Sequence, residues 1–186
     1  MRKKIILGIL LIIIIGIVGY LVVINVFFND EAEVISNEYT PEVEISDDEL
    51  RTTIVTLYFV NTESGSIASE ARLMDSKELL LDPYKTLVEI LIEGPKDSSL
   101  STVIPAETKV LSATLSGNCV TLDLSQEFID NAPQDSIQKS NMIYTIVNTL
   151  TELKEVDSVK FLINGESVSG FENEGINLTG EFVRKE

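Results

Sequence analysis

Alternating apolar and polar side chains predict a central strand at the start of the folded part of the chain. The stretch from Thr52 to Asn61 is rich in β-branched and aromatic residues, which favour strands. Its large apolar groups lie on both sides of the predicted strand: Val55, Leu57 and Phe59 on one side, and Ile54, Tyr58 and Val60 on the other. A turn over Asn61–Ser66 leads to a second predicted strand, Ile67–Met74.

A glycine turn predicts a hairpin further along the chain. Val110–Ser116 and Cys119–Leu124 flank Gly117-Asn118, a two-residue turn whose backbone twist suits adjacent antiparallel strands. Ser125–Phe128 then predicts a short turn that begins with a serine cap.

The last strands are shorter and less regular. Val159–Ile163 is an apolar strand, and Asn164-Gly165 is expected to turn it back onto a partner near Val168. The glycine-containing stretch from Phe171 to Phe182 predicts a loop with one short strand.

Two amphipathic helices separate these strands. Asp82 stands at the N-cap position of the first helix, Pro83 takes its first position, and Gly94 ends it. Its apolar stripe consists of Tyr84, Leu87, Val88, Leu91 and Ile92. A second helix, Ile137–Leu153, carries a stripe of Ile143, Ile146, Val147, Leu150 and Leu153.

The predicted order of elements is β-β-α-β-β-α-β-β. Because a helix with a single apolar stripe must bury it against another element, the pattern predicts an α+β domain. We expect two helices on one face of a mostly antiparallel or mixed sheet.

The amino terminus predicts a membrane anchor. Residues 1–4 include three basic residues and precede an apolar run over 5–28, long enough to span a hydrocarbon core about 30 Å thick. A cleaved signal peptide is the alternative, but the run is too long and ends without a small-residue cutting site. Basic residues before the span place residues 1–4 in the cytoplasm and the rest of the chain outside.

Composition divides the remaining chain into a tether and a domain. Residues 29–50 contain nine acidic residues and no basic ones, which predicts a flexible tether; it lacks a calcium-binding loop pattern. Residues 51–186 then form one domain. The whole chain carries a net charge of −16, which excludes nucleic acid as a partner.

The residue types exclude most enzyme chemistry. The chain has no histidine and only one cysteine, Cys119, so histidine-based catalysis and intramolecular disulfides are ruled out. Asp123 and Ser125 share a strand end, but no base stands near Ser125 in the sequence to activate its hydroxyl. Asn148, Thr149 and Thr151 place polar groups on the second helix, and structural hydrogen bonds are their expected role.

Five landmarks in one order resemble the GerMN domain of spore-forming and other bacteria. They are Leu91–Pro95, Val103–Leu115, Gly117–Phe128, Ile146–Leu153 with Val159–Glu166, and Gly175–Phe182. The resemblance covers Thr52 to Phe182. It implies an envelope protein of sporulation or germination, a fold similar to ring-building modules of secretion complexes, and no established catalytic residues. A single copy and the absence of a lipobox cysteine are departures from many members.

We therefore expect a non-enzymatic interaction module outside the cell membrane, with no catalytic residue, no cofactor and no metal site. Its partner is expected to be an envelope protein or a second copy of the chain. A peptidoglycan-binding accessory domain is the alternative, and a carboxylate-dependent hydrolase is a remote one. The sheet face away from the helices is the expected binding surface unless the tail covers it, because the first strand has large apolar groups on both sides. The loop over Lys96–Thr108 is a further alternative.

Overall fold

The computed structural model describes residues 17, 20, 52–171 and 176–185. Contacts divide the chain into two compact units, 1–46 and 47–186, and the fold below is that of the second unit. The predicted cytoplasmic tail, anchor and tether lie outside the described residues, apart from Ile17 and Tyr20. None of the helices described is both long and apolar enough to cross a membrane.

A long hairpin begins the domain. β1 (Thr52–Asn61) pairs antiparallel with β2 (Ile67–Asp75), and β1 also pairs with the short strand β3 (Leu100–Ser101). These strands form a sheet of order β2-β1-β3, so β1 is central, as predicted. Side chains alternate along β1: Leu57 and Phe59 are fully buried, whereas Ile54 is 71% exposed.

A second, four-stranded sheet has the order β4-β5-β6-β9. The predicted hairpin of β4 (Val110–Ser116) and β5 (Cys119–Leu124) is confirmed. β6 (Ser158–Ile163) runs parallel to β5, and β9 (Glu181–Val183) pairs antiparallel with β6, which makes the sheet mixed. Parallel pairing requires a long connection between the two strands, and α4 (Glu127–Asp130) and α5 (Ser136–Leu150) lie in it.

The first predicted helix is present as α3 (Pro83–Glu93). The Asp82 carboxylate accepts a hydrogen bond from the Lys85 amide at 3.1 Å, and Gly94 ends the helix with a φ of 104°. A short helix, α2 (Ser76–Leu81), precedes it and was not predicted. Asp75 caps α2 through the Lys77 amide.

The second predicted helix is α5 (Ser136–Leu150), which ends three residues earlier than expected. Asp135 caps its start by accepting from the Gln138 amide at 2.9 Å. Thr151 stands at its C-cap, and Leu153 follows the helix as a half-buried residue that still packs on the core.

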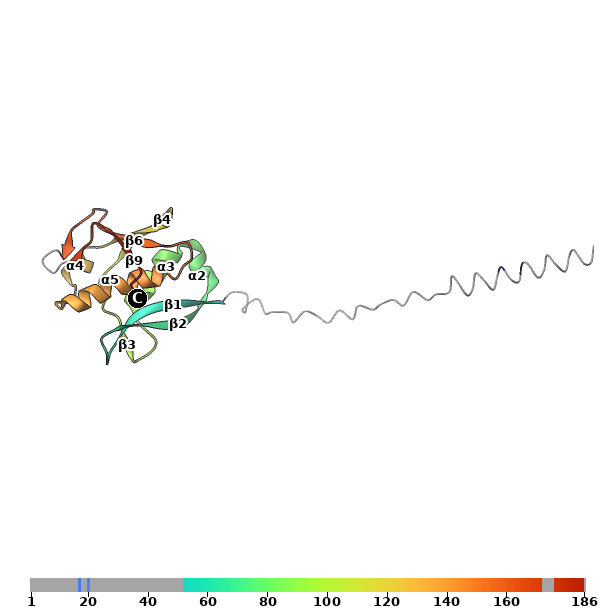
Figure 1. The fold of residues 1–186 in the computed structure, drawn as a ribbon, viewed down its shortest axis with the longest axis horizontal. Coiled ribbons are helices and arrows are strands. Elements are labelled where there is room, and N and C mark those ends of the chain that lie inside the picture. Colours follow the sequence, from blue (N-terminus) through green and yellow to red (C-terminus); the bar gives the residue numbers. More distant parts are fainter. Residues whose placement is uncertain (1–16, 18–19, 21–51, 172–175, 186) are drawn as a thin grey trace, which may run out of the picture. The chain divides into compact units, whose positions relative to one another are not determined.

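Helices α3 and α5 pack against strands of both sheets, and Figure 1 shows α5 between the β1–β2 hairpin on one side and β6 and β9 on the other. The α+β class is confirmed, but the expectation of a single sheet covered on one face by two helices is wrong. Strand pairing depends on long-range packing, and the apolar stripes of α3 and α5 do not specify one sheet or two.

The carboxyl-terminal part departs most from the predicted pattern. Asn164-Gly165 makes a tight turn with only a single bridge, between Ile163 and Glu166, instead of a hairpin with a partner near Val168. The tail forms the small sheet of β7 (Gly170–Phe171) and β8 (Ile176–Asn177) and then β9, where one strand was expected.

Candidate functional site

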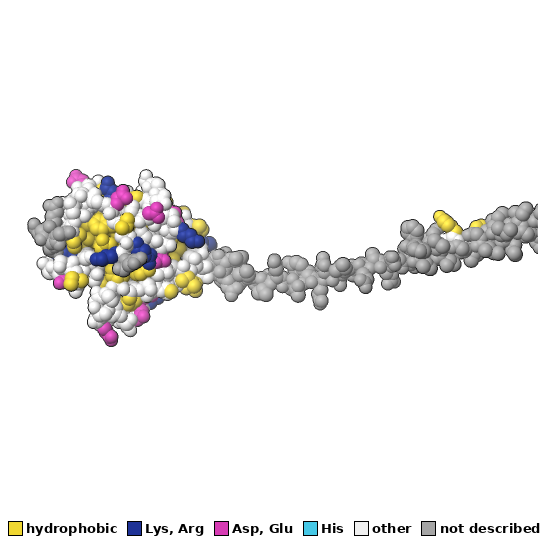
Figure 2. Space-filling model, in the orientation of Figure 1, with side chains coloured by type: hydrophobic (Ala, Val, Ile, Leu, Met, Phe, Trp, Pro, Cys, Tyr) yellow, Lys and Arg dark blue, Asp and Glu magenta, His cyan; other side chains and the backbone are white. Residues whose placement is uncertain are grey.

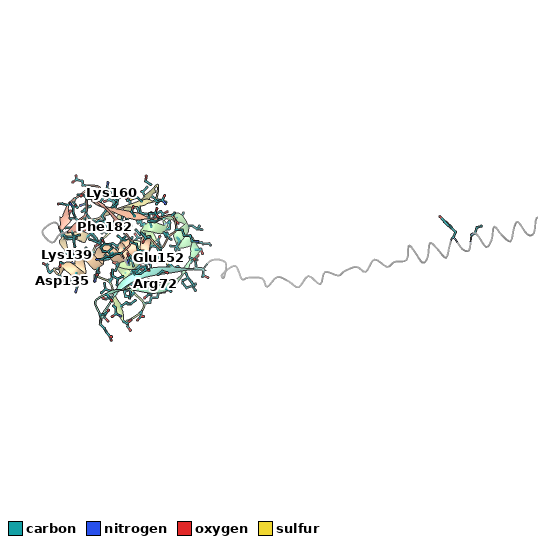
Figure 3. The ribbon with its side chains drawn as sticks, in the orientation of Figure 1. Arg72, Asp135, Lys139, Glu152, Lys160 and Phe182 are labelled. Carbon is teal, nitrogen blue, oxygen red and sulfur yellow. The ribbon has the colours of Figure 1, made fainter. Side chains whose placement is uncertain are left out.

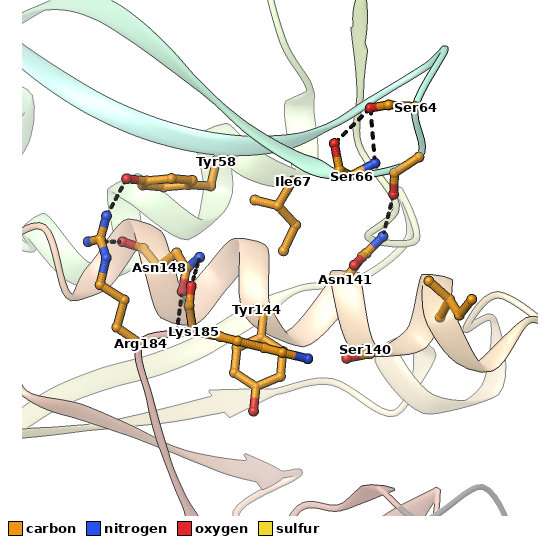
Figure 4. A pocket seen from close by; sticks show the side chains of 12 residues that line it. Tyr58, Ser64, Ser66, Ile67, Ser140, Asn141, Tyr144, Asn148, Arg184 and Lys185 are labelled. Carbon is orange, nitrogen blue, oxygen red and sulfur yellow. Dashed lines mark hydrogen bonds between the residues drawn. The ribbon is translucent and has the colours of Figure 1, made fainter.

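A groove with a volume of about 670 Å³ runs beside α5. Its floor is α5, one wall is the β1–β2 hairpin, and the other wall is the segment that follows β9 (Figure 4). Most of its lining side chains are polar or aromatic: Tyr58, Ser64 and Ser66 from the hairpin, Ser140, Asn141, Tyr144 and Asn148 from α5, and Arg184 and Lys185 from the last segment.

The hairpin wall is fixed at its tip. The side-chain oxygen of Asn61 accepts hydrogen bonds from the backbone amides of Glu63 at 3.0 Å and Ser64 at 2.9 Å, and these bonds close the turn. The Asn141 side-chain amide of α5 donates to the Gly65 carbonyl at 3.0 Å. These bonds tie the turn to the helix and hold one end of the groove at a set width.

The opposite wall is fixed by Asn148, which is 4% exposed. Its side-chain amide donates to the Lys185 carbonyl at 3.1 Å, and its side-chain oxygen accepts from the Lys185 amide at 3.2 Å. The side chain therefore pairs with the backbone as a neighbouring strand would. This is the structural role expected for Asn148, and it positions the residues that form the wall.

Arg184 joins this wall to the hairpin. Its guanidinium forms an ion pair with Glu152 and a short hydrogen bond to the Tyr58 hydroxyl, which itself donates to Glu152 at 2.7 Å. Burial and the hydrogen bond to Glu152 raise the pKa of Tyr58. The hydrogen bond from Tyr58, together with Arg184, lowers the pKa of Glu152 despite its partial burial, so Glu152 is ionised and balances Arg184.

Lys185 marks the point where the groove meets a second cavity of about 430 Å³. Ser140, Tyr144 and Lys185 line both cavities, which therefore adjoin one another beside α5. The Lys185 ammonium lies 5.0 Å from the centre of the Tyr144 ring, a cation–π distance.

Buried polar bonds complete the frame of the groove. Thr149 is fully buried, and its hydroxyl accepts a hydrogen bond from the Tyr58 amide at 3.0 Å, which satisfies a backbone donor on the edge of β1 that faces the helix. Thr151 donates to the Val147 carbonyl at 2.8 Å. Both residues have the structural role that the sequence predicts.

The other residues considered for a chemical role, Asp123, Ser125 and Cys119, lie outside the groove. Asp123 accepts from the Gly165 amide at 2.8 Å, so it supports the Asn164-Gly165 turn. Ser125 was expected to cap the following turn, but its hydroxyl accepts from the Lys109 amide at 2.9 Å, and α4 (Glu127–Asp130) begins without a side-chain cap. Cys119 is half-buried and faces away from Val120, as the alternation predicts.

The predicted binding face of the hairpin is divided in two. Val60 is 6% exposed, and the Tyr58 hydroxyl is bound by Arg184, whose guanidinium carbon lies 5.1 Å from the ring centre. Ile54 remains exposed beside Leu73, its partner in the β1–β2 register. The tail thus covers one part of this face and leaves the other open.

Sequence reasoning did not find the groove because its walls come from distant parts of the chain. Arg184 and Tyr58 are 126 positions apart, and no local pattern connects them.

In Figure 2, dark blue basic side chains lie near the middle of the visible face of the domain, beside hydrophobic ones, and most acidic ones lie towards its margin. Within the described part of the chain, no cluster of three acidic or cysteine side chains could hold a metal ion.

Comparison with known proteins identifies the family. The model of the Germane family, described as sporulation and spore germination, matches residues 56–169, more than half of the chain. The chain therefore belongs to this family, which confirms the GerMN resemblance.

Known relatives agree with this assignment. The chain is 24% identical over 172 residues to the spore germination protein GerM of Bacillus subtilis (strain 168), a match that covers 86% of this chain and 45% of GerM. The structure of the tandem GerMN domains of that protein has a TM-score of 0.59 and 26% identity, over 77% of this chain and 50% of that one. This chain thus spans about half the length of these relatives.

The first GerMN domain of Bacillus subtilis GerM, solved alone, has a TM-score of 0.60 and 21% identity. The match covers 72% of this chain and 99% of that domain. The described fold therefore corresponds to one GerMN domain. Neither the family description nor the names of these relatives assign an enzymatic activity.

Proposed function

We propose that the domain is a non-catalytic binding module of the cell envelope that holds a partner in the α5 groove during sporulation or spore germination. The observation that carries the proposal is the groove itself, whose two walls are fixed to α5 by Asn141 and Asn148. A site whose shape is set before binding loses less free energy on ordering when the partner arrives. The apolar run at 5–28, preceded by basic residues, supports a location outside the membrane.

A catalytic role finds little support in the lining of the groove. General acid and base catalysis at a glycosidic bond uses a pair of carboxyl groups, and none of the described residues that line the groove is acidic. The chain also has no histidine. The hydroxyl and amide groups that are present suit hydrogen bonding to a bound partner.

The test compares two tryptophan substitutions on the same helix. Ser140 lines both cavities, whereas Gln138 is exposed and lines neither of them. Ser140→Trp fills the groove and is expected to lower sporulation or germination efficiency in the source organism, while Gln138→Trp leaves it at the wild-type level. Both proteins should unfold at the same denaturant concentration.

A photo-cross-linking residue at the same two positions provides a direct measurement. We expect a cross-linked envelope partner from position 140 and none from position 138. Normal spore function with Ser140→Trp, or equal cross-linking from both positions, would show that the groove is not the binding site.

A further inference from the structure

The charge of the groove is opposite to that of the protein. The chain has a net charge of −16, with 30 acidic and 14 basic residues. The described lining of the groove nevertheless contains two basic residues, Arg184 and Lys185, and no acidic one. A local reversal of charge in an acidic protein favours a negatively charged ligand at this place over the surrounding surface.

The two basic residues differ in their partners. Arg184 is paired with Glu152, so its charge is largely balanced. Lys185 has the Tyr144 ring beneath its ammonium group, and it forms no ion pair with any residue that the structure describes. Among the described residues, no carboxylate pairs with Lys185, which therefore supplies the positive charge at the point where the two cavities meet.

The tyrosine rings decide between a sugar and a peptide. Sugar-binding sites use open aromatic faces, but Lys185 lies over the Tyr144 ring at 5.0 Å, and the Tyr58 hydroxyl is bound by Arg184 and Glu152. Lys185 thus covers the face of the Tyr144 ring on which a sugar would otherwise stack. The same cations remain able to donate hydrogen bonds to a carboxylate.

The two adjoining cavities give room for a ligand that extends from one into the other. Their volumes of about 670 and 430 Å³ each lie in the range of ligand-binding pockets. Ser140 lies where they meet, and its hydroxyl makes no hydrogen bond to the residues that the structure describes, so it is free to pair with a backbone group.

We propose that the occupant of the α5 groove is an extended, acidic peptide segment of a partner protein, with one of its carboxylates on Lys185. This proposal rests on the proposed function, because it names the kind of partner that the groove takes. Hydroxyl and amide groups of α5 and the hairpin pair with the peptide backbone, and the Lys185 ammonium selects for negative charge.

The test uses full-length protein in a non-ionic detergent and a fluorescein-labelled peptide of alternating glutamate and alanine. A peptide with glutamine in place of each glutamate is the neutral control, and an N-acetylglucosamine oligosaccharide represents the glycan. Fluorescence anisotropy should show binding of the acidic peptide only, and added salt should weaken it.

Two matched variants locate the binding site. Lys185→Gln removes the charge in the groove and should weaken binding of the acidic peptide about tenfold, as expected for the loss of a close charge pair. Lys77→Gln removes an exposed charge outside the groove and should leave the affinity unchanged. Equal effects of the two variants would overturn the assignment of the site to Lys185.

The oligosaccharide separates failure of this inference from failure of the proposed function. Lys185→Gln uncovers the Tyr144 ring, so a sugar ligand should bind as well as before or better. If the wild-type protein binds the oligosaccharide and not the acidic peptide, and Ser140→Trp abolishes that binding, the groove is a glycan site and only the peptide inference is wrong. If neither probe binds and position 140 yields no cross-link in cells, both proposals are wrong.

Discussion

The four-stranded sheet and the β1–β2 hairpin contact the same two helices but are held to them in different ways. On the four-stranded sheet, aromatic rings make the contacts: Phe182 on β9 meets Tyr144 of α5 edge-on at 6.1 Å. Phe161 on β6 meets Phe182 at 5.4 Å and stacks with Phe128 of α4 at 6.0 Å. The hairpin also buries apolar groups such as Leu57 and Phe59. Its edges, however, are joined to the rest of the domain by hydrogen bonds and ion pairs.

Those polar links occur at both edges of the hairpin. On β2, Arg72 pairs with Glu70 and donates to the Gly94 carbonyl at 3.0 Å, and Glu70 accepts from the Lys96 and Asp97 amides. On β1, Tyr58 bonds to Thr149 and Glu152. In Figure 3, Arg72 lies on the hairpin side of the domain, and Phe182 and Lys160 lie towards the other sheet.

The difference explains where the groove is found. At the four-stranded sheet the aromatic rings pack closely on one another, although a cavity of about 430 Å³ remains between β9 and α5. Directional polar bonds at the hairpin hold the elements at fixed points and leave a gap between those points. The larger cavity therefore lies on the hairpin side, and the buried rings of the four-stranded sheet are expected to contribute most to the stability of the domain.

Truncation of Phe161 should have the largest effect. This side chain is fully buried between two other rings, so Phe161→Ala is expected to lower the free energy of unfolding by about 4 kcal/mol. Ile54→Ala is the control on the hairpin, where the side chain is 71% exposed, and it should change stability by less than about 0.5 kcal/mol. Urea unfolding measures both. Similar losses of unfolding free energy for the two variants would contradict the expectation that the buried rings of the four-stranded sheet contribute most to stability.

Removal of the Glu70 charge tests the polar links that join the hairpin to the rest of the domain. Burial raises the pKa of Glu70, but hydrogen bonds from the Asp97 amide, Arg72 and the Lys96 amide together bring it below the ordinary value. Glu70→Gln leaves Arg72, which is 8% exposed, without its counter-charge, and should cost about 2 kcal/mol.

The control for Glu70 is Glu89, which forms an exposed helical ion pair with Lys85 at 3.8 Å. Glu89→Gln should cost less than about 0.5 kcal/mol, because exposed pairs contribute little. A loss for Glu70→Gln no larger than this would show that the buried link at β2 does not stabilise the hairpin.

The sequence predicted the elements better than their arrangement. The bounds of α3 were predictable because Asp82, Pro83 and Gly94 each have a local physical role at a helix end. The short helix α2 was not predicted because its six residues are too few to show a complete apolar stripe at helical spacing. The division of the strands among separate sheets depends on pairing between distant parts of the chain, and no local signal records that choice.

The same limit applies to the groove. Asn148 was singled out because a polar side chain beside an apolar stripe needs a partner, but its partner, the Lys185 backbone, lies 37 positions away. Lys185 itself follows the last strand in a stretch without any motif. Its significance comes only from the Tyr144 ring beneath it and the cavities on either side.

The smallest expected effect concerns the link between Arg184 and Glu152, and pH is the way to isolate it. Because the folded-state pKa of Glu152 is lowered, chiefly by the hydrogen bond from Tyr58, ionised Glu152 stabilises the folded protein. This contribution is complete above the ordinary glutamate pKa of about 4.3 and is lost as the pH falls through the lower folded-state value.

Glu152→Gln should therefore reduce stability by about 0.5 kcal/mol near neutral pH, a small effect because both partners are partly exposed. In strong acid the wild-type protein and the variant should become equally stable, since Glu152 is then protonated. Urea unfolding of both proteins across this pH range measures the difference. A difference that stays constant into strong acid would mean that Glu152 acts through its shape and hydrogen bonds, and that its charge does not hold the wall of the groove.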